Sequence, residues 1–329
     1  MEAPVKIVMT IAVRDEADII EENLRYHLGA GVDFIIATDH RSEDGTTEIL
    51  ERYERDGLLH LTRETGDAFL QTEWVTRMAR LAATRFGADW VINTDADEFW
   101  WPHSDTLREV FAAAPRGYGA LRGIWRHFAL RPDDDGAFYE RMIVRRAPAN
   151  DPADPYCANA KVVHRGEPNV CVSHGNHDAV GKGLALLREW VPFEVLHFPI
   201  RSREHLLHKY FAGRSSRLLV GPELVPAHFE RLAKSLQDEP ESLYRELLVD
   251  DDALERGLAT GLLSVDTRLR DTLSGEAVPS ASPAEDVAFA EEIDVMLAMD
   301  SAVRLEERVD AFESRLAARI KRRPVASAR

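Results

Sequence analysis

Short apolar runs alternate with amphipathic segments over roughly the first hundred residues of the chain. Each apolar run resembles a buried strand, and the segment after the first run places Ile20, Leu24 and Leu28 on one helical face before it ends at Gly29. Strands that alternate with helices predict a parallel sheet covered by helices on both faces. The predicted strands are 6–13, 33–38, 58–62 and 90–94, and the later predicted helices are 46–55 and 72–86.

Beyond Trp101 the alternation stops and strand-like segments follow one another. They predict an antiparallel or mixed addition to the edge of the first sheet, with strands at 118–128, 138–146, 161–164, 170–173 and 194–198. From Ser202 onward the pattern is helical, with predicted helices at 205–214, 226–236, 243–248, 286–299 and 302–322. The predicted organisation is an α/β domain at 1–212, a helical extension at 213–273, a linker at 274–285, and C-terminal amphipathic helices with a tail at 286–329.

Composition narrows the class of protein. The 329 residues are 45% hydrophobic and 30% charged, which is a globular balance, and the net charge of −16 makes nucleic acid a poor partner. The two cysteines, Cys157 and Cys171, form no disulfide framework. The segment from Met1 to Val13 is too short and too charged for a signal peptide or a membrane span. These features predict a soluble, cytoplasmic protein.

The segment Asp95-Ala96-Asp97-Glu98 follows the apolar run 90–94 directly. Carboxylates crowded at the end of a buried strand are suited to binding a divalent cation, here Mn²⁺ or Mg²⁺, which can in turn hold a diphosphate. Two other Asp-x-Asp segments lack a preceding apolar strand: 133–135 predicts a turn and 250–252 predicts a helix N-terminus. Because only the third segment follows an apolar strand, Asp95 and Asp97 are the predicted metal-binding aspartates.

Three predicted strands end in acidic residues, at Asp15-Glu16, Asp39 and Asp95 to Asp97. Ligands of such sheets bind beyond the carboxyl ends of the strands, so these carboxylates are expected to converge on one site. No glycine-rich fingerprint of a dinucleotide or P-loop site follows any strand, which argues against hydride transfer and ATP hydrolysis.

These motifs together resemble the nucleotide-binding half of family 2-like glycosyltransferases with a GT-A fold. The resemblance rests on the pair Asp15-Glu16, on Ser42-Glu43-Asp44-Gly45-Thr46, and on Asp95-Ala96-Asp97-Glu98-Phe99, the last typical of a bacterial branch. It extends over about residues 5–215, because 161–165, 175–177 and 197–202 also look like that branch. It implies a GT-A-like, Rossmann-like mixed sheet covered by helices, and transfer of a sugar from a nucleoside-diphosphate donor, with a UDP-sugar favoured.

The resemblance also implies site residues. Asp39 would contact the base or ribose, Asp97 would bind the metal with Asp95 beside it, and His197 would be a further metal ligand. The residues expected to hold the nucleotide are Asp15, Glu16, Asp39, Asp44, Arg77 and Asp95. One departure is that Asp39 is followed by His40 where the family has a second aspartate, so base recognition is expected to differ.

Inverting transfer needs a general base for the acceptor hydroxyl. The candidates are Glu98, His174 and His177, although Glu98 can equally orient backbone and His174 can cap a strand. The tryptophans Trp100, Trp101 and Trp125 are either sugar-stacking platforms or core residues, and Arg201 binds phosphate or forms a surface ion pair. The acceptor, whether glycan, lipid or small molecule, is open.

Two other functions remain open at this stage. The segment 175–178 matches the Gly-Asn-His-Asp of calcineurin-like phosphoesterases, but Ala17 stands where that family has the histidine of its Asp-x-His. A degenerate transferase serving as a scaffold is the other alternative. The helix at 302–322 would then form a homo-oligomer or a peripheral membrane contact through its apolar stripe.

Overall fold

A computed structural model describes residues 4–103, 106–132, 136–147, 160–207, 240–276 and 293 of the chain. The chain divides into two compact units, Met1–Pro279 and Ser280–Arg329. Several predicted features lie outside the described residues: the boundary at 212, the turn at 133–135, Cys157, the helix at 226–236, and nearly all of the linker and the C-terminal helices. No helix in the described part of the chain is both long and apolar enough to span a membrane.

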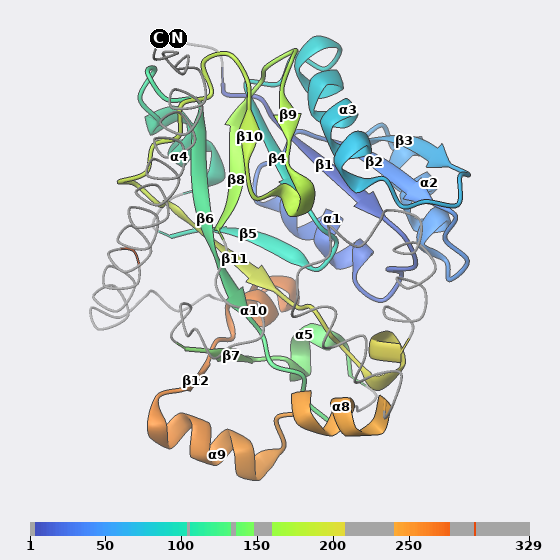
Figure 1. Cartoon of the computed structure of the whole chain (residues 1–329), viewed down its shortest axis with the longest axis vertical. Coiled ribbons are helices and arrows are strands. Elements are labelled where there is room, and N and C mark those ends of the chain that lie inside the picture. The colour runs from blue at the N-terminus through green and yellow to red at the C-terminus, as the bar shows by residue number, and fades with distance from the viewer. Residues whose placement is uncertain are drawn as a thin grey trace, which may run out of the picture. The chain divides into compact units, whose positions relative to one another are not determined.

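The first unit is built on one eight-stranded mixed sheet, in the order β3-β2-β1-β4-β8-β6-β11-β5 (Figure 1). The first four strands along the chain are parallel and match the prediction: β1 Ile7–Val13, β2 Phe34–His40, β3 Leu59–Glu64 and β4 Trp90–Thr94. The other half of the sheet contains β5 Glu98–Pro102, β6 Ala120–His127, β8 Ala160–Arg165 and β11 Phe193–His197. Here β8 is antiparallel to β4 and β6, whereas β11 is parallel to β6. The predicted mixed addition is confirmed for the strands at 118–128, 161–164 and 194–198, whereas the strand predicted at 170–173 belongs to a separate two-stranded sheet.

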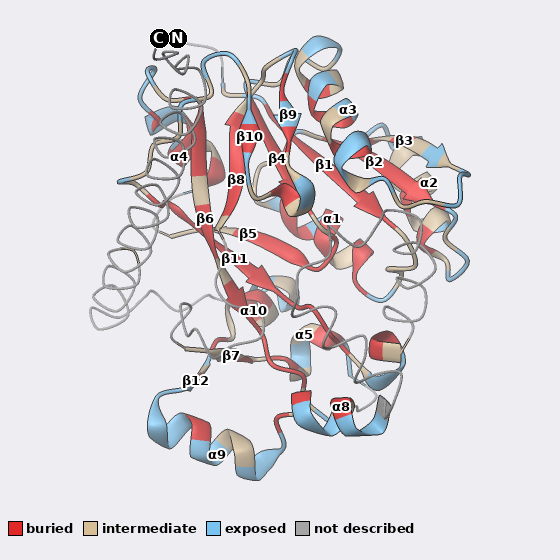
Figure 2. Cartoon of the chain, viewed as in Figure 1, coloured by how far each residue is buried: buried red, intermediate tan, exposed pale blue. Residues whose placement is uncertain are grey.

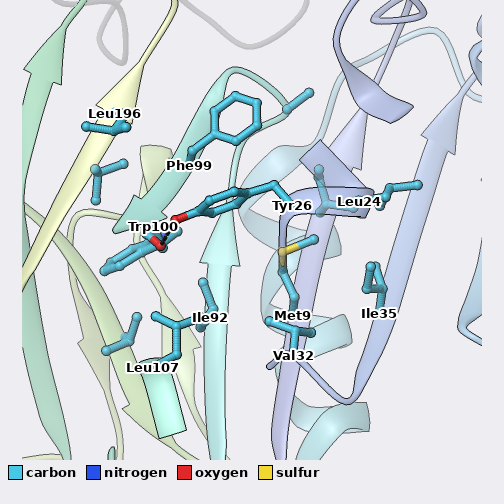
Figure 3. Close-up of a cluster of buried hydrophobic side chains, with 14 of the residues drawn as sticks. Met9, Leu24, Tyr26, Val32, Ile35, Ile92, Phe99, Trp100, Leu107 and Leu196 are labelled. Carbon is cyan, nitrogen blue, oxygen red and sulfur yellow. Dashed lines mark hydrogen bonds between the residues drawn. The ribbon is translucent and has the colours of Figure 1, made fainter. Parts of the chain in front are cut away.

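Helices cover both faces of the sheet and confirm the predicted alternation. They are α1 Ile20–Gly29, α2 Thr46–Arg55, α3 Gln71–Thr84 and α4 Leu107–Ala113. On one face, Met78 of α3 packs in a cluster with Val8 and Ile36 of the strands. On the other face, α1 contributes Leu24 and Tyr26 to a larger cluster, in which the hydroxyl of Tyr26 donates to the carbonyl of Trp100 at 3.0 Å (Figure 3). The strands are accordingly buried along most of their length (Figure 2).

Two local predictions are wrong. The segment predicted as one strand at 138–146 forms a short helix, α5 Phe138–Arg141, followed by β7 Val144–Arg146. The Glu140 carboxylate accepts from the backbone N–H of Ala137, an arrangement that favours a helical turn there. The strand β5, which contains Glu98, was not predicted at all. Its backbone is held from both sides, because β5 pairs with β11 and Trp100 N–H donates to His27 Nε2 at 3.2 Å.

The helical extension was predicted at 213–273 and the linker at 274–285; the structure describes 240–276 of this region, which lies within the first compact unit. It contains α8 Pro240–Leu247, α9 Asp251–Thr260, β12 Leu263–Val265 and α10 Arg268–Ser274. The predicted helix N-terminus at 250–252 is confirmed, because the Asp250 carboxylate accepts from Ala253 N–H at 2.8 Å. In this segment β12 pairs with β7 in a separate two-stranded sheet, and Arg268 contacts the buried Glu194 of β11 in the large sheet. The segment is therefore not helical throughout.

Candidate active site

The ends of β1 and β2 lie side by side, since Val13 is in register with Asp39. The loops that follow them interlock: the Asp15 carboxylate accepts from Glu43 N–H at 2.7 Å, and Asp44 accepts from Ala17 N–H at 2.8 Å. The predicted convergence of strand-end carboxylates is thus present for this part of the site. Several of these carboxylates hold the loops themselves in place.

Asp39 illustrates this use of carboxylates. One of its oxygens accepts from the Ser42 hydroxyl at 2.6 Å and the other from the Thr47 hydroxyl at 2.5 Å, and the residue is only 3% exposed. Asp39 therefore fixes the turn that leads into α2. Arg77, by contrast, lies on the outer side of α3, where its half-exposed guanidinium pairs with Glu64.

At the end of β4 the Asp95 carboxylate accepts three hydrogen bonds. Gln71 donates to Oδ1 at 2.7 Å, Asn176 donates to the same oxygen at 3.2 Å, and Lys161 Nζ lies 3.0 Å from Oδ2. Lys161 also donates to the carbonyl of Gly175. Asp95 therefore ties together α3, β8 and the loop 173–178.

Glu98 is completely buried at the start of β5. Its Oε1 lies 2.7 Å from Lys161 Nζ and accepts from Trp125 Nε1 at 2.9 Å, while Oε2 accepts from Asp95 N–H at 3.2 Å. Burial raises the pKa of Glu98 above its usual value, which the charge of Lys161 opposes. Burial also lowers the pKa of Lys161, but the carboxylates of Asp95 and Glu98 outweigh this effect, so its pKa is raised and Lys161 keeps its charge.

Asp97 and His197 face each other, with His197 Nε2 3.6 Å from Asp97 Oδ2. In the described part of the chain, these two residues and Glu98 form the one group of acidic, histidine or cysteine side chains whose ligand atoms lie within 4.8 Å of one another. Carboxylate oxygen and imidazole nitrogen both bind Mn²⁺. All three side chains of this group are buried. The donor set therefore fits a divalent cation.

Trp125, on β6, lies at the centre of these groups. Its strand runs between β8 and β11, and its ring contacts Lys161 from one neighbour, 4.7 Å from the centroid, and His197 from the other, stacked at 4.6 Å. His177 meets the same ring edge-on at 5.3 Å. The ring of Trp125 thereby packs against the side chains of Lys161, His197 and His177.

The two loop histidines differ in environment. His174 is exposed at the start of the short helix η1 (His174–Asn176). His177 is partly buried, and its Nδ1 lies 3.1 Å from the carbonyl of Ala160. Burial and, to a smaller extent, the charge of Lys161 lower the pKa of His177 to about 4, so the ring is neutral at pH 7. The short strands on either side of this loop are β9 Cys171–Val172 and β10 Ala179–Val180.

The mixed sheet, with its acidic cluster at the carboxyl end of β4, has the GT-A-like arrangement that the sequence predicted. The sequence model of glycosyltransferase family 92 matches residues 8–175, just over half of the chain, and spans the cluster of Asp95, Asp97 and Glu98. The chain belongs to glycosyltransferase family 92. The prediction that the chain is a glycosyltransferase is therefore confirmed. The family that matches is family 92, whereas the motifs had suggested a family 2-like group.

The solved structures that match the chain do so at low similarity. TarS 1–349 of S. aureus in complex with UDP-GlcNAc has a TM-score of 0.35 and 10% identity, over 70% of each chain. The mannosyltransferase PcManGT of Pyrobaculum calidifontis, in complex with GDP-Man and Mn²⁺, has a TM-score of 0.34 and 15% identity, over 95% of this chain and 85% of that one. No curated protein matches the sequence. Likeness this low says nothing about the donor or metal of the glycosyltransferase described here.

Arg201 joins the two halves of the transferase site. It is fully buried just after β11, and its guanidinium donates to both carboxylate oxygens of Asp18 at 2.7 Å and to Glu16 at 2.5 Å. Burial lowers the pKa of Arg201, but the charges of Glu16 and Asp18 more than offset this, so its pKa is raised. Glu16, expected at the nucleotide, is therefore held by an internal ion pair, and Arg201 is not on the surface.

The sequence-based selection did not include Gln71 and Lys161, which contact Asp95, or His127, whose Nδ1 lies 2.8 Å from Nδ1 of His197. A signal existed for Lys161, because a lysine inside the predicted strand 161–164 has to be paired if it faces the core. No comparable signal existed for His127 or Gln71, which enter the site only through the packing of β6 and α3.

Proposed function

We propose that this glycosyltransferase moves a sugar from a nucleoside-diphosphate donor to an acceptor hydroxyl, with inversion and with Mn²⁺ or Mg²⁺. The observation that carries the proposal is the buried cluster of Asp97, His197 and Glu98 at the carboxyl end of β4. Substrates of open α/β sheets bind at that edge. The donor class, with a UDP-sugar favoured, rests on the sequence resemblance.

Asp97 and His197 would hold the metal, since their ligand atoms face each other across 3.6 Å. The metal, when bound, supplies positive charge to the departing nucleoside diphosphate. Glu98 lies within reach, but Lys161, Trp125 and a backbone N–H already donate to it, so its role is to keep the turn rigid. Asp95, engaged by three donors, has the same supporting role.

We infer that His177, among the predicted candidates, is the general base. A carbonyl oxygen only accepts hydrogen bonds, so Nδ1 of His177 carries the proton donated to Ala160 and Nε2 keeps a lone pair. That lone pair can take the proton of an acceptor hydroxyl. Glu98 is fully buried and engaged, and His174 is exposed at the surface.

Thermal unfolding with each of UDP, GDP, CMP and dTDP, in Mn²⁺ and in EDTA, tests the donor and the metal. We expect stabilisation by one nucleotide in Mn²⁺ and not in EDTA, because a ligand at a hundred times its dissociation constant adds about 2.7 kcal/mol of stability. Asp97→Asn is expected to abolish the Mn²⁺-dependent shift, whereas the control Asp252→Asn removes an exposed carboxylate on α9 and leaves it unchanged. A full shift in Asp97→Asn would exclude the metal assignment.

Two further measurements separate the remaining parts of the proposal. The anomeric configuration of the product, read by NMR, is expected to be inverted relative to the donor. His177→Gln is expected to lower kcat by about 10²-fold or more without lowering nucleotide affinity. An unchanged kcat would show that another group takes the proton of the acceptor hydroxyl.

A further inference from the structure

A second histidine stands behind the proposed metal ligand. β6 and β11 are parallel neighbours, and His127 and His197 are in register, so both side chains lie on the same face of the sheet. Both residues are buried, at 4% and 8% exposure, and their Nδ1 atoms lie 2.8 Å apart. That separation is a hydrogen bond between two imidazoles.

A hydrogen bond between two Nδ1 atoms has two possible directions. If His127 donates, Nδ1 of His197 is the acceptor, and a neutral His197 carries its proton on Nε2, pointing at Asp97. If His197 donates, its proton is on Nδ1, and Nε2 presents a lone pair to Asp97. Only the second direction allows a neutral His197 to bind a cation through Nε2.

We propose that His127 is a positioning residue that accepts the Nδ1–H of His197 and thereby keeps the Nε2 lone pair of His197 available for the metal. The inference rests on the proposed metal role of Asp97 and His197. Histidine ligands commonly donate their other ring N–H to a fixed acceptor, which sets the tautomer and the ring orientation. Here the acceptor is an imidazole nitrogen.

The ring plane of His197 is restrained separately. Trp125 stacks on it with an interplanar angle of 16° and a centroid separation of 4.6 Å. Trp125 also contacts His127 edge-on at 5.0 Å. Stacking leaves the imidazole free to carry its proton on either nitrogen, so the tautomer depends on His127 rather than on Trp125.

The test compares two variants at the same position. His127→Leu removes the acceptor, whereas His127→Asn keeps an amide oxygen close to the place of Nδ1. We expect His127→Leu to weaken Mn²⁺ binding about 10- to 100-fold, measured by the free Mn²⁺ signal in electron paramagnetic resonance, and His127→Asn to recover most of the loss. Equal Mn²⁺ affinity in wild type and His127→Leu would overturn the proposal, as would a His127→Asn variant as weak as His127→Leu.

Pulsed electron paramagnetic resonance separates this inference from the proposed function. If wild type with Mn²⁺ shows no ¹⁴N coupling from a bound imidazole, the metal role of His197 fails. If coupling is present in wild type and unchanged in strength and affinity in His127→Leu, only the role of His127 fails.

A measurement on the wild type alone covers the case in which His127→Leu does not fold. In ¹⁵N-histidine spectra with Cd²⁺, we expect a proton on Nδ1 of His197 and none on Nδ1 of His127. The reverse assignment would overturn the proposal.

Discussion

Lys161 is a buried cation whose removal should destabilise the protein strongly. Its side chain is 1% exposed, and Nζ lies 3.0 Å from Asp95 and 2.7 Å from Glu98. The replacement Lys161→Met keeps most of the volume and deletes the charge, so the fully buried Glu98 loses its counter-charge. Removing one partner of a buried ion pair costs about 3–5 kcal/mol.

The loss of folding stability in Lys161→Met should depend on the charge of Glu98 and therefore on pH. In Lys161→Met the pKa of Glu98 in the folded state rises further above its value in the unfolded chain, about 4.3. In folded wild type the pKa of Glu98 is already raised to about 8, so below about pH 8 the carboxyl is protonated in both folded proteins and the extra penalty is absent. The penalty appears as pH rises above about 8, where wild-type Glu98 ionises beside Lys161 and Glu98 of the variant does not. The double variant Lys161→Met with Glu98→Gln carries no such charge, so at pH 9 it should be more stable than the sum of the single losses predicts, by about 1 kcal/mol.

Urea unfolding in EDTA at pH 6 and pH 9, followed by fluorescence, measures these differences. The exposed Lys182 provides a matched control as Lys182→Met, which should change the free energy of unfolding by less than about 0.5 kcal/mol. A loss below about 1 kcal/mol for Lys161→Met at pH 9 would refute the reasoning. Strict additivity of Lys161→Met and Glu98→Gln would do the same.

Three further predictions concern other parts of the fold. Gly175→Ala should lower the melting temperature and kcat together, because Gly175 has φ +67° and a Cβ there would lie 2.9 Å from the ring of His177; unchanged kinetics would contradict this. Asp250→Ala should cost about 1 kcal/mol in urea unfolding by removing the cap on Ala253, with no change in activity. Burial lowers the pKa of His27 to about 4, below its unfolded value of about 6.5, so stability should fall as pH drops from about 6.5 to 4, by about 3 kcal/mol from this residue. His27→Gln, which does not titrate, should show a shallower fall, and an equal slope would exclude this cause.

Local pattern was enough to predict the parallel half of the sheet. The segments 46–55 and 90–94 form α2 and β4 with the predicted bounds, because their periodicities are local and right-handed crossovers leave little choice of topology. The acidic ends of neighbouring parallel strands then had to meet at one edge. The Asp250 cap was predictable for the same reason, since a cap involves residues three apart.

The other half depended on contacts between distant segments. β5 was missed because it is stabilised by pairing with β11, and α5 was mistaken for a strand because four residues carry too little periodicity. Lys161 lies 66 residues from Asp95 along the chain, and His127 lies 70 residues from His197.

The sequence alone therefore determined the fold class, the family resemblance and the carboxylates at the end of β4. Tertiary structure decided what those carboxylates do. Asp95, Asp97 and Glu98 are nearly adjacent and chemically alike, yet Asp95 and Glu98 are held by Lys161 while Asp97 faces His197. The physical reason is that a side chain's chemistry is local, whereas its partners are set by strand order and register, which bring β8, β6 and β11 beside β4 and β5.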